Sequence, residues 1–370
     1  MGYVMVTGGK EAVEQAEKLA SYYRVREADE PLRITEIKAQ MRFIVDRVMG
    51  EGGLYSPDYA ALALKQAEGD PIEAAFLLRA YRSTLTRNFI SCTIDTDKMR
   101  IIRRISSAFK DIPGGQILGP TNDYTHHLLD FSLMDESDNE FSSIRSEFEG
   151  VERDVEGIEF KKVVEILSDK GYLARPIEAE CIEPFDITRE NMVFPAPRSA
   201  RLQTLARGET GAMVALAYSS LRGYGVVHAK IGELRVGYVP VYVKYPYSEE
   251  GEEIYIGEIM ITEVEAINSF TQNEGEGKPK FVLGYGLCFG HNEAKGIAMS
   301  LLDHCLNVKG NTPVHNEEFV LVHIDSIEAS GFVNHLKLPH YVTFQSSLDR
   351  IKEAQERNGL QEEDIDVSTL

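Results

Sequence analysis

The sequence predicts an α+β fold with a helical N-terminal half and a mixed α/β C-terminal half. Two patterns support this prediction. From residue 9 to about 110, apolar residues recur at the spacing of helices. From 228 to 290, runs rich in Val, Ile, Tyr and Phe are separated by Gly, Pro and acidic turns, as in β-strands. With 370 residues, 43% of them hydrophobic, the chain is long enough for more than one core.

We expect two domains that are joined by an acidic segment. A mainly helical domain covers 1–134, and a mixed α+β domain covers 160–350. Between them, residues 135–159 contain ten acidic side chains against Arg145 and Arg153, which indicates an exposed linker or insertion. Residues 351–370 are expected to be helical at first and then to form a disordered acidic tail.

Three signals place helices in the first domain. An apolar set at helical spacing ends at the Gly pair 52–53. The pairs 56–57 and 70–71 are Ser-Pro and Asp-Pro, each an N-cap followed by proline at the first helical position. A further helix is predicted from Asp95 or Thr96 to the Pro-Gly-Gly stop at 113–115. The apolar set consists of Ile34, Ile37, Met41, Ile44, Val45 and Val48.

The second domain is predicted to mix helices and strands. Helices are expected near 159–170, from about 199, over 209–221, from Asn292 to about 307, and from Ser346 onward. Strands are expected over 236–243, 254–262, 280–289 and 318–324, with another near His340.

Composition limits the classes of function. A formal charge of −20 opposes non-specific binding to nucleic acid, although it does not exclude a nucleotide. The four cysteines are scattered without zinc or iron–sulfur spacing. No apolar run approaches the roughly 20 residues that span a bilayer, and the N-terminus MGYVMVTGGK lacks signal-peptide features. We therefore expect a cytoplasmic protein that binds neither nucleic acid nor membrane.

Two stretches contain candidate anion-binding residues. Residues 284–303 predict a strand, a turn and a helix, so Gly286, Gly290 and Lys295 are candidates for binding a phosphate at the helix N-terminus. The alternative is a plain strand-to-helix turn. Arg79 and Arg82 lie one helical turn apart and are candidates for a phosphate clamp. The alternative is a solvated helix face.

Histidines occur in three further stretches. Residues 109–127 form a Gly- and Pro-rich segment with Asp123 and His126, either a ligand loop or a long turn. The stretch 222–228 ends at His228 and matches no phosphate-binding motif. His335 and His340 are five positions apart with Pro339 before the second, so one continuous helix cannot pair them, whereas a turn brings both rings to one point. They are half of a metal site, a catalytic pair, or two unrelated surface imidazoles.

Several long phrases together resemble subunit I of the bacterial carbon–phosphorus lyase system, the PhnI family. They include YSPDYAALALKQAEGDPIEAAFLLRAYRSTL, FKDIPGGQILGPTNDYTHHLLDFSL, YSSLRGYGVVHAKIGELRVG, VLGYGLCFGHNEAKGIAMSLLD and SGFVNHLKLPHYVTFQSSL. The resemblance runs from the N-terminus to about residue 350. The acidic region 135–159 and the residues after 357 match least.

The resemblance implies a subunit of a phosphonate-degrading core complex with subunits G, H and J. It implies a transferase that replaces adenine at C1′ of ATP with methylphosphonate, giving α-D-ribose 1-methylphosphonate 5-triphosphate. It further implies a purine nucleosidase activity of the chain alone and a homodimer within the complex, and it maps the family's histidine pair onto His335 and His340, facing subunit J. From the two imidazoles themselves we expect a divalent metal such as zinc at this pair. Such a displacement needs a carboxylate and an acid, for which Asp123, His126, His228 and Glu233 are candidates.

Two other hypotheses remain open. The chain is either a non-catalytic scaffold of the complex, which its lack of a strong catalytic motif favours, or an independent metal-dependent hydrolase built on the histidine pair. Release of free adenine from ATP by the purified chain separates the first hypothesis from these two.

Overall fold

A computed structural model describes residues 9–149, 161–174, 183–223, 228–247, 251–272 and 279–357. The chain divides into two compact units, Leu32–Ser326 and a second unit made of Met1–Pro31 and Ile327–Leu370. The described residues form thirteen α-helices and one antiparallel sheet, which confirms the predicted α+β class.

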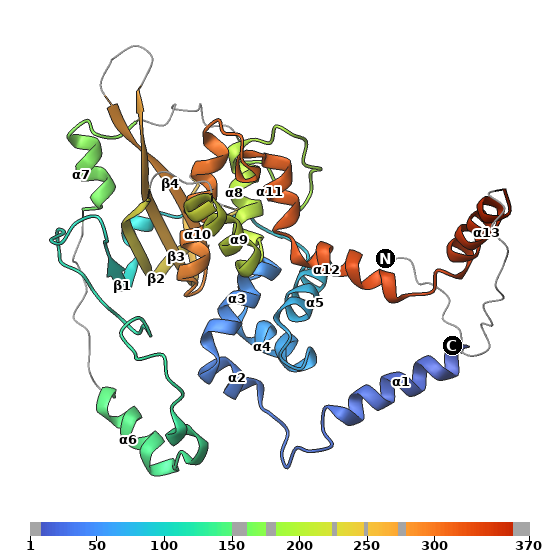
Figure 1. Cartoon of the computed structure of the whole chain (residues 1–370). Helices are drawn as coiled ribbons and strands as arrows, with labels where there is room; N and C mark the ends of the chain where they lie inside the picture. Colours follow the sequence, from blue (N-terminus) through green and yellow to red (C-terminus); the bar gives the residue numbers. More distant parts are fainter. Residues whose placement is uncertain are drawn as a thin grey trace. The chain divides into compact units, whose positions relative to one another are not determined.

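The sheet lies in the larger unit and has four antiparallel strands in the order β1-β2-β3-β4 (Figure 1). Their bounds are Arg100–Ile105, Lys230–Lys244, Glu253–Gln272 and Pro279–Phe289. Leu234 is opposite Val264, which is opposite Gly286, so these three positions lie on one face. The three strands predicted between 228 and 290 are confirmed as β2, β3 and β4.

Helices α8 to α11 pack together in one layer, in which α10 and α8 contact β4. Their bounds are Arg198–Arg207, Thr210–Tyr218, Glu293–Asn307 and Glu317–His323. The core of this layer contains Leu205, Met213 and Leu302. A Cβ added at Gly286 would lie 2.2 Å from the carbonyl oxygen of Gly296, so α10 packs directly on the backbone of β4. The predicted helices from 199, over 209–221 and from Asn292 are confirmed.

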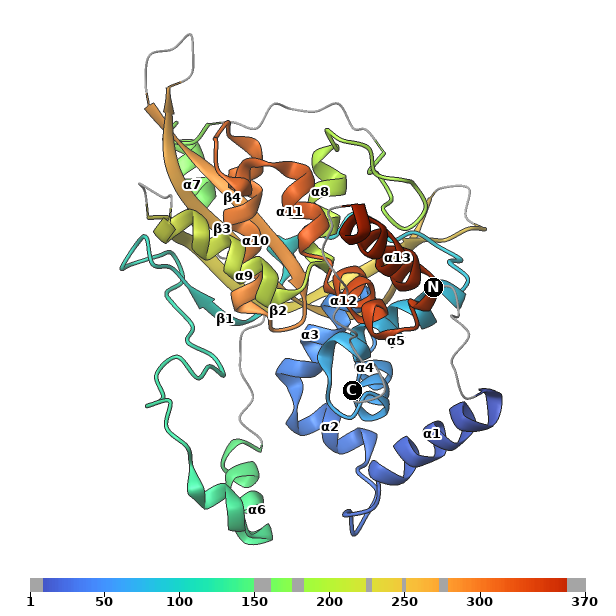
Figure 2. The same cartoon turned by 45° about the vertical axis from the view of Figure 1, so that its right-hand side comes forward.

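Helices α2 to α5 form a second group, seen below the sheet in Figure 2. Their bounds are Ile34–Gln40, Arg42–Gly52, Pro57–Gln66 and Pro71–Thr84. Ser56 and Asp70 cap α4 and α5 as predicted, and the carboxylate of Asp70 accepts hydrogen bonds from the N–H groups of Ile72 (2.8 Å) and Glu73 (3.2 Å). Helix α3 also contacts α8 and β4, which brings its first turn to the start of α10.

The prediction of a helix from Asp95 or Thr96 to the stop at 113–115 is wrong. Residues Thr96–Lys98 form a short 3₁₀ turn, and β1 follows at Arg100. The sequence RIIRRI has apolar residues at a spacing that suits either structure, and pairing with β2 decides between them. Arg103 and Arg104 are both fully buried in β1, because each forms ion pairs with carboxylates from elsewhere in the chain.

The strands predicted over 318–324 and near His340 are also wrong, because both segments are helical. Asn316 caps α11 by accepting a hydrogen bond from the N–H of Phe319 at 2.9 Å. Val320 and Leu321 are buried on one helical face, so packing prevails over the strand preference of the sequence FVLV. After His340, the chain enters a 17-residue helix.

The acidic segment contains a helix in its described part. Helix α6, Asp138–Phe148, begins with a capping box of Ser137 and Glu140 and has no buried residue. A 3₁₀ turn, Phe131–Asp135, precedes it, and α7, Val163–Asp169, confirms the helix predicted near 159–170. The rest of the predicted linker, 150–159, lies outside the described residues.

The smaller unit contains α1, α12, a 3₁₀ turn and α13. Their bounds are Gly9–Tyr23, Ser326–Asn334, His335–Lys337 and Tyr341–Arg357, with α12 beginning at the boundary between the units. None of these elements has a buried residue. The tail predicted to be disordered lies, from residue 358 on, outside the described residues.

Within the described ranges, no helix is both long and apolar enough to cross a membrane.

Charged side chains are buried on the sheet face opposite α10. Arg235 contacts Glu263, and Lys162 lies 3.6 Å from the same carboxylate. Glu265 follows Glu263 at a two-residue step on β3 and is partly buried. Burial, with the charge of Glu263 as the next cause, raises the pKa of Glu265 from 4.5 to about 7.

This network predicts that stability falls as the pH rises from about 4.5 to about 7. The unfolded chain loses the Glu265 proton near pH 4.5, whereas the folded chain retains it to about pH 7. The folded state therefore binds more protons in this window, and its stabilisation falls by at most about 3 kcal/mol. Urea unfolding at pH 5 and pH 7.5 measures the free energy of unfolding of the wild type and of Glu265→Gln. We expect the variant to become more stable relative to the wild type at the higher pH. Parallel pH profiles for the two proteins would contradict the assignment.

Candidate functional site

The candidate site is a pocket of about 330 Å³ at the N-terminus of α10. Strand β4 ends at Phe289, and Gly290 turns the chain with a φ of +71°. A Cβ at Gly290 would lie 2.4 Å from the Cβ of Asp46, so this turn requires glycine. The pocket is lined by residues of α3, a loop after β1, α9, the turn between β4 and α10, and α10 itself, namely Phe43, Thr121, Asn122, Asp123, Thr210, His291, Asn292, Glu293, Ala294 and Lys295.

His291 is a buried imidazole whose hydrogen bonds define its tautomer. Its Nδ1 lies 3.2 Å from Nη1 of Arg42, and its Nε2 lies 2.5 Å from Oε1 of Glu293. A guanidinium only donates, so Nδ1 accepts and the N–H is on Nε2, where it donates to Glu293. The backbone N–H of His291 donates to Asp46 at 2.9 Å. The ring is therefore held in one orientation.

Arg103 connects the loop wall of the pocket to α10. Its fully buried guanidinium donates to the carbonyl of Leu118 and to the carboxylate of Asp123. Its Nε lies 2.7 Å from Oε1 of Glu293, as an ion-pair contact whose alignment is too poor for a hydrogen bond. Burial raises the pKa of Glu293, but the hydrogen bond to His291 and the charge of Arg103 outweigh it and hold that pKa below its usual value.

Lys295 is the most unusual residue of the pocket. It is 0% exposed, and its Nζ has no hydrogen-bond partner among the described residues. A Cβ added at Gly50 would lie 3.3 Å from this Nζ, so the ammonium group lies against α3. Burial lowers the pKa of Lys295.

The structure brings together some of the residues predicted from sequence. Asp123 and Lys295 line the same pocket, although they are 172 positions apart, and Gly290 makes the turn directly before His291. Gly286 instead allows α10 to pack closely on β4. His126 lies three positions beyond Asp123 and is exposed.

Other predicted residues are not among those that line this pocket. Glu233 is buried in an ion pair with Arg104, and His228 is exposed. Arg79 donates to both carboxylate oxygens of Asp325, at 2.7 and 3.0 Å. Burial lowers the pKa of Arg82. The roles predicted for these residues stay predictions.

Sequence reasoning missed His291, Glu293, Arg42 and Thr210. The first two lie inside the strand-turn-helix stretch that suggested Lys295, and their adjacency to the helix start is a signal that can be read from sequence. Arg42 and Thr210 carry no local signal, because only the packing of α3 and α9 brings Arg42 to His291 and Thr210 to the pocket.

The predicted metal pair lies in the smaller unit. The rings of His335 and His340 have centroids 5.3 Å apart and are tilted by 52°. The Nδ1 of His335 contacts the carbonyl oxygen of Phe332, and that of His340 lies 2.6 Å from the carbonyl oxygen of Leu338. A carbonyl oxygen only accepts, so both rings carry their proton on Nδ1 when neutral, which leaves each Nε2 able to bind a metal. Among the described residues, no third His, Cys, Asp or Glu completes a metal-binding group.

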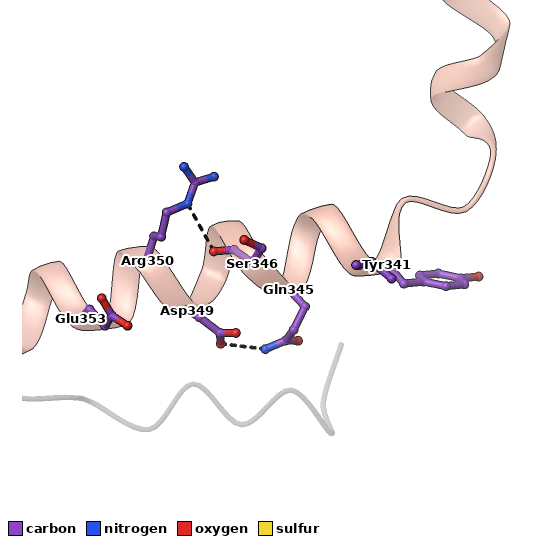
Figure 3. A pocket seen from close by; sticks show the side chains of 7 residues that line it. Tyr341, Gln345, Ser346, Asp349, Arg350 and Glu353 are labelled. Atoms are coloured by element: carbon purple, nitrogen blue, oxygen red, sulfur yellow. Dashed lines mark hydrogen bonds between the residues drawn. The ribbon is translucent and has the colours of Figure 1, made fainter.

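A shallow surface on α13 is not a candidate site. Figure 3 shows that its side chains all project from one helix, with Gln345 donating to Asp349 at 2.8 Å. One helix face with exposed side chains does not enclose a ligand.

The chain matches known proteins over nearly its whole length. The model of the family described as bacterial phosphonate metabolism protein (PhnI) matches residues 2–358. A putative C–P lyase subunit protein HtxH of Stutzerimonas stutzeri is 49% identical over 365 residues, covering 96% of this chain and 97% of that protein. Two proteins named α-D-ribose 1-methylphosphonate 5-triphosphate synthase subunit PhnI are also similar. The protein from Escherichia coli K12 is 46% identical, covering 96% of this chain and 98% of its own length. The protein from Rhizobium meliloti 1021 is 43% identical, covering 95% and 94%. The chain therefore belongs to the PhnI family of bacterial phosphonate metabolism proteins.

Proposed function

We propose that this subunit of the phosphonate C–P lyase system displaces adenine from C1′ of ATP with methylphosphonate. The product is α-D-ribose 1-methylphosphonate 5-triphosphate, so the subunit acts as a transferase. The observation that carries the proposal is the name of two relatives, 46% and 43% identical over at least 94% of either chain, which are called subunits of a synthase of this compound.

The proposed reaction exchanges one bond at the anomeric carbon. A phosphonate oxygen forms a bond to C1′, while the bond from C1′ to the purine nitrogen breaks and its electron pair leaves with adenine, which takes up a proton. Positive charge develops on the sugar, where a carboxylate stabilises it, and negative charge develops on the base, where an acid protonates it. When water replaces the phosphonate, the same step gives ribose 5-triphosphate, which is the proposed nucleosidase activity of the chain alone.

Asp123 and His126 are our first choice for the carboxylate and the acid. Both belong to the loop after β1, and Asp123 lines the pocket with its side chain 54% exposed. His228 and Glu233 are the second choice, since Glu233 is already engaged by Arg104. Arg79, Arg82, Gly286, Gly290 and Lys295 remain proposed nucleotide-binding residues, of which Lys295 lines the same pocket as Asp123.

We further propose that His335 and His340 bind a divalent metal such as zinc through Nε2. The two Nδ1–H groups donate to backbone carbonyl oxygens, an arrangement that commonly orients metal-binding imidazoles. A bound metal would act as a Lewis acid toward phosphoryl oxygens. Two imidazoles do not fill a tetrahedral zinc site, so the remaining ligands come from solvent, substrate or another subunit.

The proposed setting is a cytoplasmic core complex with subunits G, H and J, in which this chain forms a homodimer. The relatives are named as subunits, which supports an assembly. The apolar residues exposed on α6, Phe141, Ile144 and Phe148, are consistent with surfaces that other chains cover.

Adenine release tests the proposed function. The purified full-length chain is incubated with ATP, and free adenine is quantified by chromatography. The reaction is then repeated with methylphosphonate and subunits G, H and J, and ³¹P NMR follows the phosphonate ester. We expect adenine release by the chain alone and ester formation in the complex, with Asp123→Asn lowering kcat of both by about 10- to 1,000-fold. Absence of adenine in every mixture would contradict the proposed reaction and leave the scaffold and the metal-dependent hydrolase as the alternatives.

A further inference from the structure

Lys295 is a buried cation whose Nζ lacks a hydrogen bond within the described part of the chain. Its side chain is 0% exposed, and no described residue forms a hydrogen bond with its Nζ. An ammonium group removed from water is strongly destabilising unless hydrogen bonds or an opposite charge replace its hydration. A residue in this state stabilises neither the core nor the surface, so its presence needs another explanation.

The carboxylates around the pocket are engaged by other groups. Glu51 accepts from Nε of Arg47 at 2.9 Å and from the N–H and hydroxyl of Thr210 at 3.1 and 3.0 Å. Asp46 accepts from the backbone N–H of His291, and Glu293 from its ring. Asp123 contacts Arg103, and Glu209 contacts Arg47. The charge of Glu51 also acts on Lys295, but no carboxylate among the described residues forms a hydrogen bond with its Nζ, which leaves the N–H groups of the ammonium for a ligand.

The start of α10 provides a second, independent feature. This helix is 15 residues long, and the side chain of its N-cap residue Asn292 makes no capping hydrogen bond. By contrast, Glu209 caps α9 by accepting from the N–H groups of Gly211 and Ala212. The N-terminus of a helix attracts anions through its free N–H groups and its dipole. Ala294, Glu293 and Lys295, in the first turn of α10, line the pocket.

From these two features together, we propose that the pocket binds a tetrahedral phosphorus oxyanion between Lys295 and the first turn of α10. In naming phosphorus, this inference rests on the proposed function, whose reactants carry both a phosphonate and a triphosphate. The volume of about 330 Å³ is at the lower end of ligand pockets, which suits one phosphonate or the end of a triphosphate. A role in binding this ligand explains why the chain has a buried lysine that lowers its free energy of unfolding.

The proposal predicts that Lys295→Met stabilises the chain and weakens anion binding. Methionine has nearly the length of lysine and is apolar, so it fills the same space without a buried charge. We expect the melting temperature to rise by about 2–4 °C. We expect the affinity for the bound anion to fall about 10- to 100-fold, which is the usual loss when a hydrogen bond to a charged group is removed. Lys309→Met, at an exposed position just beyond the other end of α10, is the matched control and should change neither quantity.

Calorimetric titration of the full-length chain with methylphosphonate and, separately, with inorganic triphosphate identifies the source of the oxyanion. Methylphosphonate binding that depends on Lys295 assigns the pocket to the phosphonate, and triphosphate binding that depends on Lys295 assigns it to the nucleotide. Unchanged affinity of Lys295→Met for both probes would overturn the inference, whatever the melting temperature. If the variant does not fold, the melting temperature of the wild-type protein is measured with each probe. A melting temperature that neither probe raises would also overturn the inference. Lys295-dependent binding without adenine release would contradict only the proposed reaction, whereas adenine release without such binding would contradict only this inference.

Discussion

Complexes that carry His335→Ala or His340→Ala are expected to lose most of their bound metal and to fail in phosphonate breakdown. Each imidazole would be one of two ligands from this chain, so removing either leaves a single one. The double variant should therefore lose little more than either single variant, because the two residues act as one unit. Metal analysis of the purified complexes and growth on methylphosphonate as the phosphorus source measure the two effects.

His323→Ala is the matched control for this pair. His323 is also exposed, and its Nδ1 lies 2.7 Å from the carbonyl oxygen of Phe319, so it has the same tautomer. Its ring stacks on Phe319 with ring centroids 4.3 Å apart, whereas the ring of His335 lies beside that of His340. Metal content and growth should be unchanged. Adenine release by the isolated chain should survive in all three variants, because the proposed catalytic residues belong to the larger unit. Normal growth of both single variants would reduce His335 and His340 to surface imidazoles.

The turn between these histidines shows what local sequence can predict. Pro339 prevents a continuous helix, and the structure accordingly ends α12 at Asn334 and forms a short 3₁₀ turn. The segment after His340 begins with Tyr-Val-Thr-Phe, which favours a strand by propensity. It is helical instead, because the polar residues that follow continue a helix and its first turn includes the 2.9 Å bond from the Phe344 N–H to the carbonyl of His340. In this segment the single residue Pro339 predicted the break in the helix correctly, whereas the average strand propensity of Tyr-Val-Thr-Phe did not predict the helix that follows.

The candidate pocket was predictable only in part, for a related physical reason. Lys295 and Gly290 belong to one strand-turn-helix stretch, so the sequence pattern locates both at a helix start. That Lys295 is buried without a hydrogen bond depends on α3 packing against β4, which no local pattern encodes. Similarly, Arg103 and Arg104 are adjacent in a strand, and only pairing with β2 and the loops shows that both are buried. Charged residues that the fold buries are the ones that sequence reasoning misassigns, because composition alone places them at the surface.

Glu233→Ala is expected to lower the free energy of unfolding by about 3–5 kcal/mol, which is a large fraction of the stability of a typical domain. The carboxylate is 1% exposed, and its Oε1 lies 2.5 Å from Nε of the fully buried Arg104. Its Oε2 accepts from the N–H of Val163 at 2.9 Å, the first residue of α7, so it also connects α7 to the sheet. Removing it leaves the buried guanidinium without this carboxylate and α7 without its anchor.

Urea unfolding of Glu233→Ala measures this effect, and a double-mutant cycle with apolar replacements tests its cause. The cycle compares Glu233→Leu, Arg104→Met and the double variant, which should regain most of the lost stability because no unpaired charge remains buried. Asp58→Ala is the control, since its ion pair with Lys38 is exposed and should contribute less than about 1 kcal/mol.

Adenine release per folded molecule of Glu233→Gln then separates a structural from a catalytic role. We expect a rate near that of the wild type, because both carboxylate oxygens are already occupied. A Glu233→Gln protein with wild-type stability and no adenine release would instead make Glu233 the catalytic carboxylate.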